Sequence, residues 1–227
     1  MSLSIEFKGS KGRFASLNPF ELRDVLQGFP GYTVVSNIID KGHTKAAQKV
    51  GGGHLSLFTL RSIDPVILPT GDVVYPQIML RDRSYPGGSL TLTFGLYRMV
   101  CSNGLFAFRN VATPVSIPHY RNRAQFLMEL TRTIAASADK FAAIIAETGR
   151  LNSVAVLDPK LAIEAMTLPP KVKALAIERI EAGLVRPEDD INTAWGLYNF
   201  VNELDRVKAR RNSLAYLDRD QSFHHAA

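Results

Sequence analysis

Cys101 is the first residue that the sequence offers for chemistry, because a thiolate is a strong nucleophile and the chain has no other cysteine. A catalytic thiol needs a general base beside it. The histidines available for that role are His43, His54, His119, His224 and His225. None of them stands in a motif typical of cysteine enzymes. Cys101 lies in the apolar segment GLYRMVCSNGLFAF, residues 95–108, so we interpret it as a small buried hydrophobic residue.

Asp82 is the second candidate, because it stands at the end of an expected strand in the sequence MLRDRSY. Strand ends beside glycine-containing turns are places where functional sites are often built. An enzyme that uses Cys101, or Asp82 together with His119, is our third functional hypothesis. No complete set of acid, base and nucleophile can be named, and we therefore expect that the protein is not an enzyme.

Metal and cofactor chemistry lack their usual sequence patterns. There is no Cys-x-x-Cys and no His-Glu-x-x-His, and the glycines at 51–53 match neither a P-loop nor a dinucleotide-binding fingerprint. The acids Glu188, Asp189 and Asp190 follow Pro187, where we expect them to cap a helix rather than to catalyse. We predict no metal site and no cofactor.

Basic and aromatic residues form the most informative group. Arginine neutralises phosphate, aromatic rings stack on unpaired bases, and a helix start offers free N–H groups to phosphate. With 27 lysines and arginines against 21 acidic residues, a phosphate-rich partner is permitted. The predicted nucleic-acid contacts are Arg81, Arg83, Tyr85, Tyr97, Arg98, Tyr120, Arg121, Arg123, and Lys45 or Lys49.

The elements that must position these residues begin with a short helix after Asn18, which Gly28 and Pro30 end. A strand is expected over 32–40, followed by a basic, glycine-rich loop. The stretch from 54 to 108 contains several strands. In one of them Leu90, Leu92 and Phe94 alternate with polar residues, which indicates a sheet with one buried face.

Helical spacing follows. An apolar stripe predicts a long helix over about 121–148. Shorter helices are expected over about 159–168, 170–182 and 188–207. The predicted fold is α+β: a mostly antiparallel sheet over about 32–108, covered by the long helix, with a helical C-terminal third. We assign residues 1–150 to the core domain and 151–227 to a helical region packed on it.

The composition of this 227-residue chain sets the remaining limits. An apolar share of 46% and a charged share of 21% are typical of a globular protein. No apolar run of about 18 residues is present, and the start of the sequence does not read as a secretory signal. The lone cysteine agrees with a reducing compartment. We expect a cytoplasmic protein without a membrane partner.

The segment GLYRMVCSNGL, preceded by IMLRDRSYPGGSLTLTF, resembles the signature of the phage and plasmid proteins grouped as domain of unknown function 932. The later INTAWGLYNFVNELDRV is similar to that family's C-terminal helix. The matching motif residues are Gly95, Arg98, Cys101, Asn103 and Gly104. Where relatives often carry Asn-Ser-His-Asp, this chain has Asp82 to Tyr85 and lacks the His-Asp pair. Asn103-Gly104 also has a local explanation, because Asn-Gly favours a tight turn between strands.

The phage and plasmid setting of that family implies DNA metabolism or the countering of host defence. The order of strands and long helix is also similar to phage single-strand annealing proteins, a comparison that allows a homo-oligomer. Our leading hypothesis is a non-enzymatic protein that binds or anneals single-stranded DNA in recombination or replication. The alternative is a protein-interaction module that counters a host defence system and uses a surface around Trp195 and Tyr198.

Overall fold

The computed structural model describes residues 19–40, 54–84, 88–98, 103–106, 112–119 and 122–209. The strands in this part of the chain form one antiparallel sheet in the order β1-β2-β4-β5-β6. These are β1 (Tyr32–Asp40), β2 (His54–Ser62), β4 (Val73–Ser84), β5 (Ser89–Arg98) and β6 (Asn103–Phe106). Two short strands complete it: β3 (Val66–Ile67) pairs with β4, and β7 (Val115–Pro118) pairs with β5.

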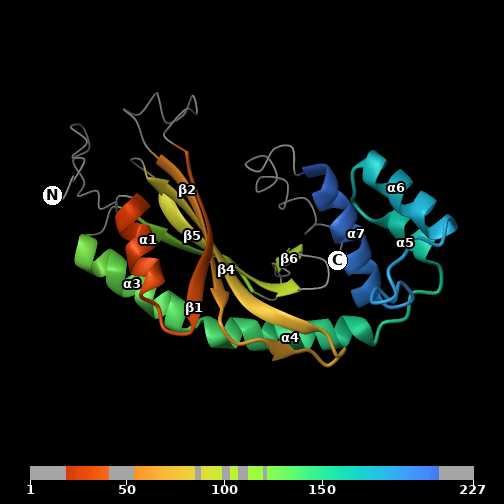
Figure 1. Ribbon diagram of the computed structural model, residues 1–227, viewed down its shortest axis with the longest axis horizontal. Coiled ribbons are helices and arrows are strands. Elements are labelled where there is room, and N and C mark those ends of the chain that lie inside the picture. Colours follow the sequence, from red (N-terminus) through yellow and green to blue (C-terminus); the bar gives the residue numbers. More distant parts are fainter. Residues whose placement is uncertain are drawn as a thin grey trace.

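One face of the sheet is covered by helices. α1 (Pro19–Gln27), α3 (Arg123–Ala135) and α4 (Ser137–Asn152) pack against it, and α3 and α4 follow one another along its length (Figure 1). The core between the layers contains Leu22 of α1, Phe58 and Ile78 of the sheet, and Leu130 and Phe141 of the helices. These side chains are buried, and their removal from water supplies the main stabilising free energy of the layer.

The predicted α+β class, with a helix-covered antiparallel sheet and helices toward the C-terminus, is confirmed. The long helix expected over 121–148 is divided in two, because the helix that begins at Arg123 ends before Ala136, whose ψ is 6°. Asn122 caps this helix by accepting a hydrogen bond from the N–H of Gln125. Ser137, the first residue of α4, is buried, and its Oγ lies 3.1 Å from the hydroxyl of Tyr32 on β1.

The C-terminal helices have a core of their own. They are α5 (Pro159–Ala165), α6 (Pro170–Glu181) and α7 (Ala194–Ala209), and they lie beyond the end of the sheet that carries β6 (Figure 1). Ile163, Val172 and Phe200 form part of a separate buried cluster between them. Trp195 of α7 instead belongs to the core beneath the sheet, so α7 joins the two regions. The domain boundary after residue 150 stays a prediction.

The last helix begins later than residue 188. Residues 188–193 are not helical, and Thr193 caps the start of α7, because its Oγ1 accepts a hydrogen bond from the N–H of Gly196. The prediction that Glu188 to Asp190 cap a helix is therefore wrong. Asp190 caps a turn by accepting from the N–H of Asn192, and Asp189 points into the protein.

Candidate nucleic-acid interface

Strand alternation separates two sets of side chains in β4 and β5. The even-numbered residues, such as Leu80 and Leu92, are buried against the helices, whereas the odd-numbered residues, apart from the buried Gln77 and Gly95, are partly exposed or exposed. The odd-numbered face carries Arg81 and Arg83 of β4, and Arg61 of β2 pairs with Gln77 on the same face. We call this side of the sheet the arginine face.

Two tyrosines lie on the arginine face near one end. Tyr75 of β4 and Tyr97 of β5 are directly opposite one another in the strand register. The guanidinium of Arg61 stacks over the Tyr97 ring, with its central carbon 3.4 Å from the ring centroid. Gly95 stands beside Gln77 in the register and has no side chain.

The arginine face carries no carboxylate in β2, β4 or β5. These three strands contain one acidic residue, Asp82, and it belongs to the buried even-numbered set. On the neighbouring strand β1, Asp40 pairs with Leu55, which in turn pairs with Arg83, so one acid shares this face. Three arginines against one acid favour a phosphate-bearing partner. Arg61 and Tyr75 were not among the residues predicted from the sequence. Strand alternation gives a signal for Tyr75, which shares the odd-numbered set of β4 with Arg81, whereas Arg61 is placed only by the β2–β4 register.

Arg98 lies on the opposite side of β5 and is 1% exposed. Its Nε and Nη2 donate to Oδ1 of Asp72 at 3.0 and 2.7 Å, and its Nη1 donates to Oδ1 of Asp189 at 2.5 Å. Nη2 also donates to the carbonyl oxygen of Glu188 at 2.9 Å. The prediction that Arg98 contacts phosphate is therefore wrong, because two carboxylates already hold its guanidinium inside the protein.

The groups around Arg98 connect three parts of the molecule, and we call them the Arg98 network: Arg98, Asp72, Asp189 and Trp195. Asp72 precedes β4, and its Oδ2 accepts a hydrogen bond from the indole N–H of Trp195 at 3.0 Å. Asp189 lies in the connection between α6 and α7. The network thus ties the sheet to the C-terminal helices. It also buries Trp195, so the predicted interaction surface around that residue is wrong.

Two carboxylates share one guanidinium in this network, and the electrostatics reflect that imbalance. Burial raises the pKa of the Asp189 carboxyl, although the hydrogen bond and charge of Arg98 act to lower it. Burial acts to lower the pKa of Arg98, but the hydrogen bonds and charges of Asp189 and Asp72 outweigh it, and the pKa is raised. Arg98 is therefore a permanent cation with a structural role.

Asp82 and His119 do come together. Nε2 of His119 lies 2.7 Å from Oδ1 of Asp82, and both side chains are 1% exposed. The His119 ring stacks on Phe126 of α3 at a centroid distance of 5.3 Å. A His–Asp pair is able to exchange protons, but this one is enclosed between the sheet and α3. Its evident effect is to tie the end of β7 to β4. In the described part of the chain, no group of three or more His, Cys, Asp or Glu residues is arranged to hold a metal ion.

The remaining predicted residues divide into two groups. Arg123 is exposed at the start of α3, and its Nη2 lies 3.6 Å from Oε1 of Glu21 on α1, in the helix layer and away from the arginine face. The others lie outside the described residues: Lys45, Lys49, Tyr85, Cys101, Tyr120 and Arg121.

Within the segment 95–108, the described residues 95–98 and 103–106 pair as antiparallel strands, as expected. Gly95 pairs with Phe106 and Arg98 pairs with Asn103, so Asn103 and Gly104 are strand residues of β6. The prediction that Asn103-Gly104 forms the turn is wrong, because both residues are paired with β5 in the ladder.

The fold and site define an α+β protein with an arginine-bearing sheet face and a buried ion network behind it. The chain belongs to the family described as domain of unknown function (DUF932), which matches residues 31–227. No curated protein and no solved structure matches the chain. Among the described helices, none has the length and apolar character that crossing a membrane requires.

Proposed function

We propose that this protein binds single-stranded DNA along the arginine face, in the recombination or replication of a phage or plasmid. The observation that carries the proposal is the charge pattern of the sheet. Arg61, Arg81 and Arg83 share one face, while the single acid of their strands and of β5 is turned to the other. A face of this kind neutralises phosphates, and its binding is predicted to weaken as salt rises.

The dimensions of the face suit an extended strand. Arg61 is opposite Gln77, so Arg83 lies six residues farther along β4. At about 3.4 Å per residue, the positions of Arg61 and Arg83 are separated by about 20 Å along the strands, which is enough for several nucleotides. Tyr75 and Tyr97 lie at one end. The Arg61 guanidinium covers one face of the Tyr97 ring, so we propose that bases stack on Tyr75 and on the other face of Tyr97. Stacking and phosphate contacts imply little sequence specificity.

The proposed interface therefore differs from the one that the sequence predicts. Arg61 and Tyr75 join Arg81, Arg83 and Tyr97, and Arg98 is removed. Contacts by the residues outside the described part stay predictions, as do a cytoplasmic location and self-association into an oligomer. Annealing two complementary strands would require that each bound strand leave its base edges accessible, which backbone neutralisation permits.

The first test is fluorescence anisotropy of labelled single- and double-stranded oligonucleotides at several salt concentrations. We expect tighter binding to the single strand and a linear fall of log affinity with log salt. The variant R61Q/R81Q/R83Q removes three phosphate contacts, and at about 0.7 per phosphate its salt slope should be shallower by about 2. Circular dichroism and thermal unfolding establish that the variant is folded.

R23Q is the matched control, because Arg23 lies on α1 in the helix layer, where it pairs with Asp24. It removes one positive charge from the other side of the sheet, as each single substitution in the triple variant does, and should leave the salt slope within about 0.5 of the wild-type value. Equal slopes for wild type and the folded triple variant would rule out the arginine face as the site of DNA binding. No binding at low salt would rule out the function itself.

A protein-interaction role remains a second candidate, and it rests on the C-terminal helices. Leu157, Leu161 and Leu184 are 98%, 63% and 61% exposed. If these side chains form one contiguous apolar patch, they would suit a surface that binds another protein. This role predicts that a host protein co-purifies after nuclease treatment and is lost with L157S/L161S. Loss of all partners on nuclease treatment would favour DNA binding.

A further inference from the structure

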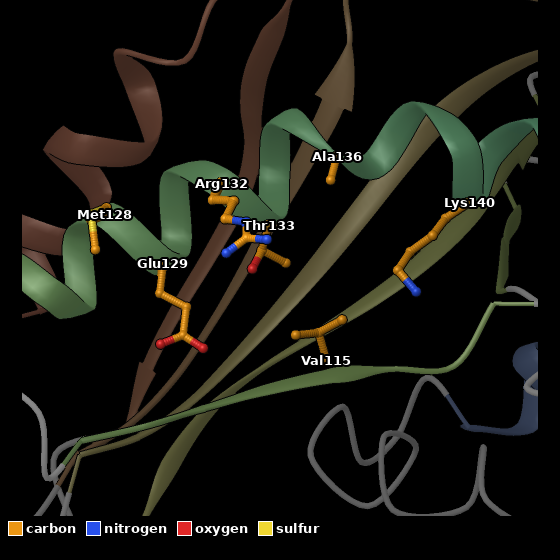
Figure 2. Close-up of a pocket in the computed structure, with 7 residues that line it drawn as sticks. All are labelled: Val115, Met128, Glu129, Arg132, Thr133, Ala136 and Lys140. Carbon is orange, nitrogen blue, oxygen red and sulfur yellow. The ribbon is translucent and has the colours of Figure 1, made fainter.

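A groove lies between the edge strand β7 and the helices α3 and α4. It has a volume of about 400 Å³, and its lining residues are Val115, Met128, Glu129, Arg132, Thr133, Ala136 and Lys140. Figure 2 shows the α3 side chains of Glu129, Arg132 and Thr133 reaching toward β7, with Val115 on the opposite wall. The groove thus has a strand as one wall and a helix as the other.

The strand wall is a sheet edge. β7 pairs with β5 through Leu92↔Val115 to Ser89↔Pro118, and in the described part of the chain no strand pairs with its other side. The outer edge of such a strand presents backbone N–H and C=O groups to an incoming chain. An extended peptide uses these groups when it adds to a sheet as a further strand.

The groove is lined by both apolar and positively charged side chains. Val115, Ala136 and the 67% exposed Met128 offer apolar contact. Arg132 is exposed and, among the described residues, makes no ion pair. Nζ of Lys140 donates to the carbonyl oxygen of Thr113 at 3.2 Å and has two further N–H donors. Two cations against one acid, Glu129, favour a negatively charged occupant.

We propose that this groove binds an extended, acidic peptide segment of a partner protein, which adds to the free edge of β7. The peptide backbone bonds to β7, and its acidic side chains reach Arg132 and Lys140. Alternate apolar side chains pack on Val115 and Met128, as the two-residue period of a strand requires. A peptide fits better than a nucleic-acid strand because the walls combine a sheet edge with apolar side chains.

The site is separate from the arginine face. Val115 is paired with Leu92, which belongs to the buried, even-numbered set of β5. Residues directly opposite each other in a ladder point to the same side of the sheet, so the groove opens on the helix side. The proposal therefore does not depend on DNA binding, and each is able to fail without the other.

The test is selection of a displayed random octapeptide library on the full-length wild-type protein. Selected peptides are then synthesised with a fluorescent label, and their affinity is measured by anisotropy. We expect selected sequences rich in Asp and Glu alternating with apolar residues. R132E should weaken their binding at least tenfold, because it replaces attraction by repulsion at the rim. R150E makes the same change on the exposed end of α4 and should have no effect.

Two further arms distinguish strand addition from simple charge attraction. Two versions of the peptide are made, one N-methylated at its odd-numbered amides and the other at its even-numbered amides. Only one version should lose binding, because only one of these sets of N–H groups faces β7. An unlabelled oligothymidylate should not displace the peptide. The proposal is overturned if no acidic peptide is selected or if R132E and wild type bind the peptides equally. It is also overturned if neither N-methylated peptide loses affinity, or if the oligonucleotide displaces the peptide.

Discussion

The Arg98 network and the arginine face use the same side chain for opposite purposes. Arg98 is 1% exposed and has a carboxylate on each side, whereas Arg81 and Arg83 are partly exposed on strands whose one acid points away from them. The role of each arginine follows from whether it belongs to the buried even-numbered set or to the odd-numbered set of its strand. An arginine paired with buried acids holds the fold together, and arginines that outnumber the acids on a partly exposed face favour a negatively charged partner.

The largest effect is expected from breaking the Arg98 network at its cation. R98A leaves Asp72 and Asp189 facing each other inside the protein without their cation. The free energy of unfolding should fall by about 3 to 5 kcal/mol, as for other broken buried ion pairs. Chemical denaturation monitored by circular dichroism measures it. The same experiment on R83A should give a change within about 0.5 kcal/mol. Similar losses for both variants would contradict the division of roles.

A close backbone approach beside the network gives the next largest effect. A Cβ at Gly196 of α7 would stand 2.0 Å from the carbonyl oxygen of Asp190, next to the residue that binds Arg98. Backbone atoms cannot yield as a flexible side chain does, so G196A should cost about 2 to 3 kcal/mol.

The matched control is G149A on α4, where a Cβ would lie 3.4 Å from Cγ of Pro69, at ordinary contact distance. Alanine is the better helix former, so G149A should be neutral or stabilising by up to about 1 kcal/mol. Thermal unfolding of both variants provides the comparison. A harmless G196A would mean that α7 does not pack on residues 188–193 in this way.

The smallest effect is a pH dependence that arises from Asp189. Burial raises the pKa of this carboxyl above its ordinary 3.8, so the folded protein binds the proton more tightly than the unfolded chain. Its contribution to stability is present below pH 3.8 and is lost as pH rises through the raised pKa. D189N lacks this titration. The wild-type stability relative to D189N should therefore decline over that window in urea unfolding experiments, and a difference that stays constant or grows would contradict the assignment.

Local patterns predicted much of the fold. The alternation of Leu90, Leu92 and Phe94 correctly predicted the buried face of β5, and helical spacing correctly predicted the covering helices. The same alternation extends to Arg98, which shares their even-numbered row, so its burial was available from the sequence. Its polar character suggested a surface role instead. The acids that hold it could not be predicted, because they stand 26 and 91 residues away in the sequence.

The candidate site was less predictable for a related reason. Arg61 and Tyr97 come from different strands, and their contact depends on a register that no local motif encodes. The turn expected at Asn103-Gly104 shows the opposite case. Asn-Gly has a strong local preference for turns, but both residues are in β6 because they pair with Arg98 and Tyr97 of β5. The sequence predicted which residues of one strand share a face, but it did not predict which residues of different strands are paired.

The most direct test of the central claim is photo-cross-linking of a bromodeoxyuridine-containing single strand, followed by mass spectrometry of the cross-linked peptides. Aromatic side chains that stack on bases are efficient targets, so the account predicts cross-links at Tyr75 and Tyr97, and their loss in Y75L/Y97L with protein stability retained. Reproducible cross-links confined to α3, α4 or the C-terminal helices, or none at all under conditions of saturated binding, would contradict DNA binding on the arginine face.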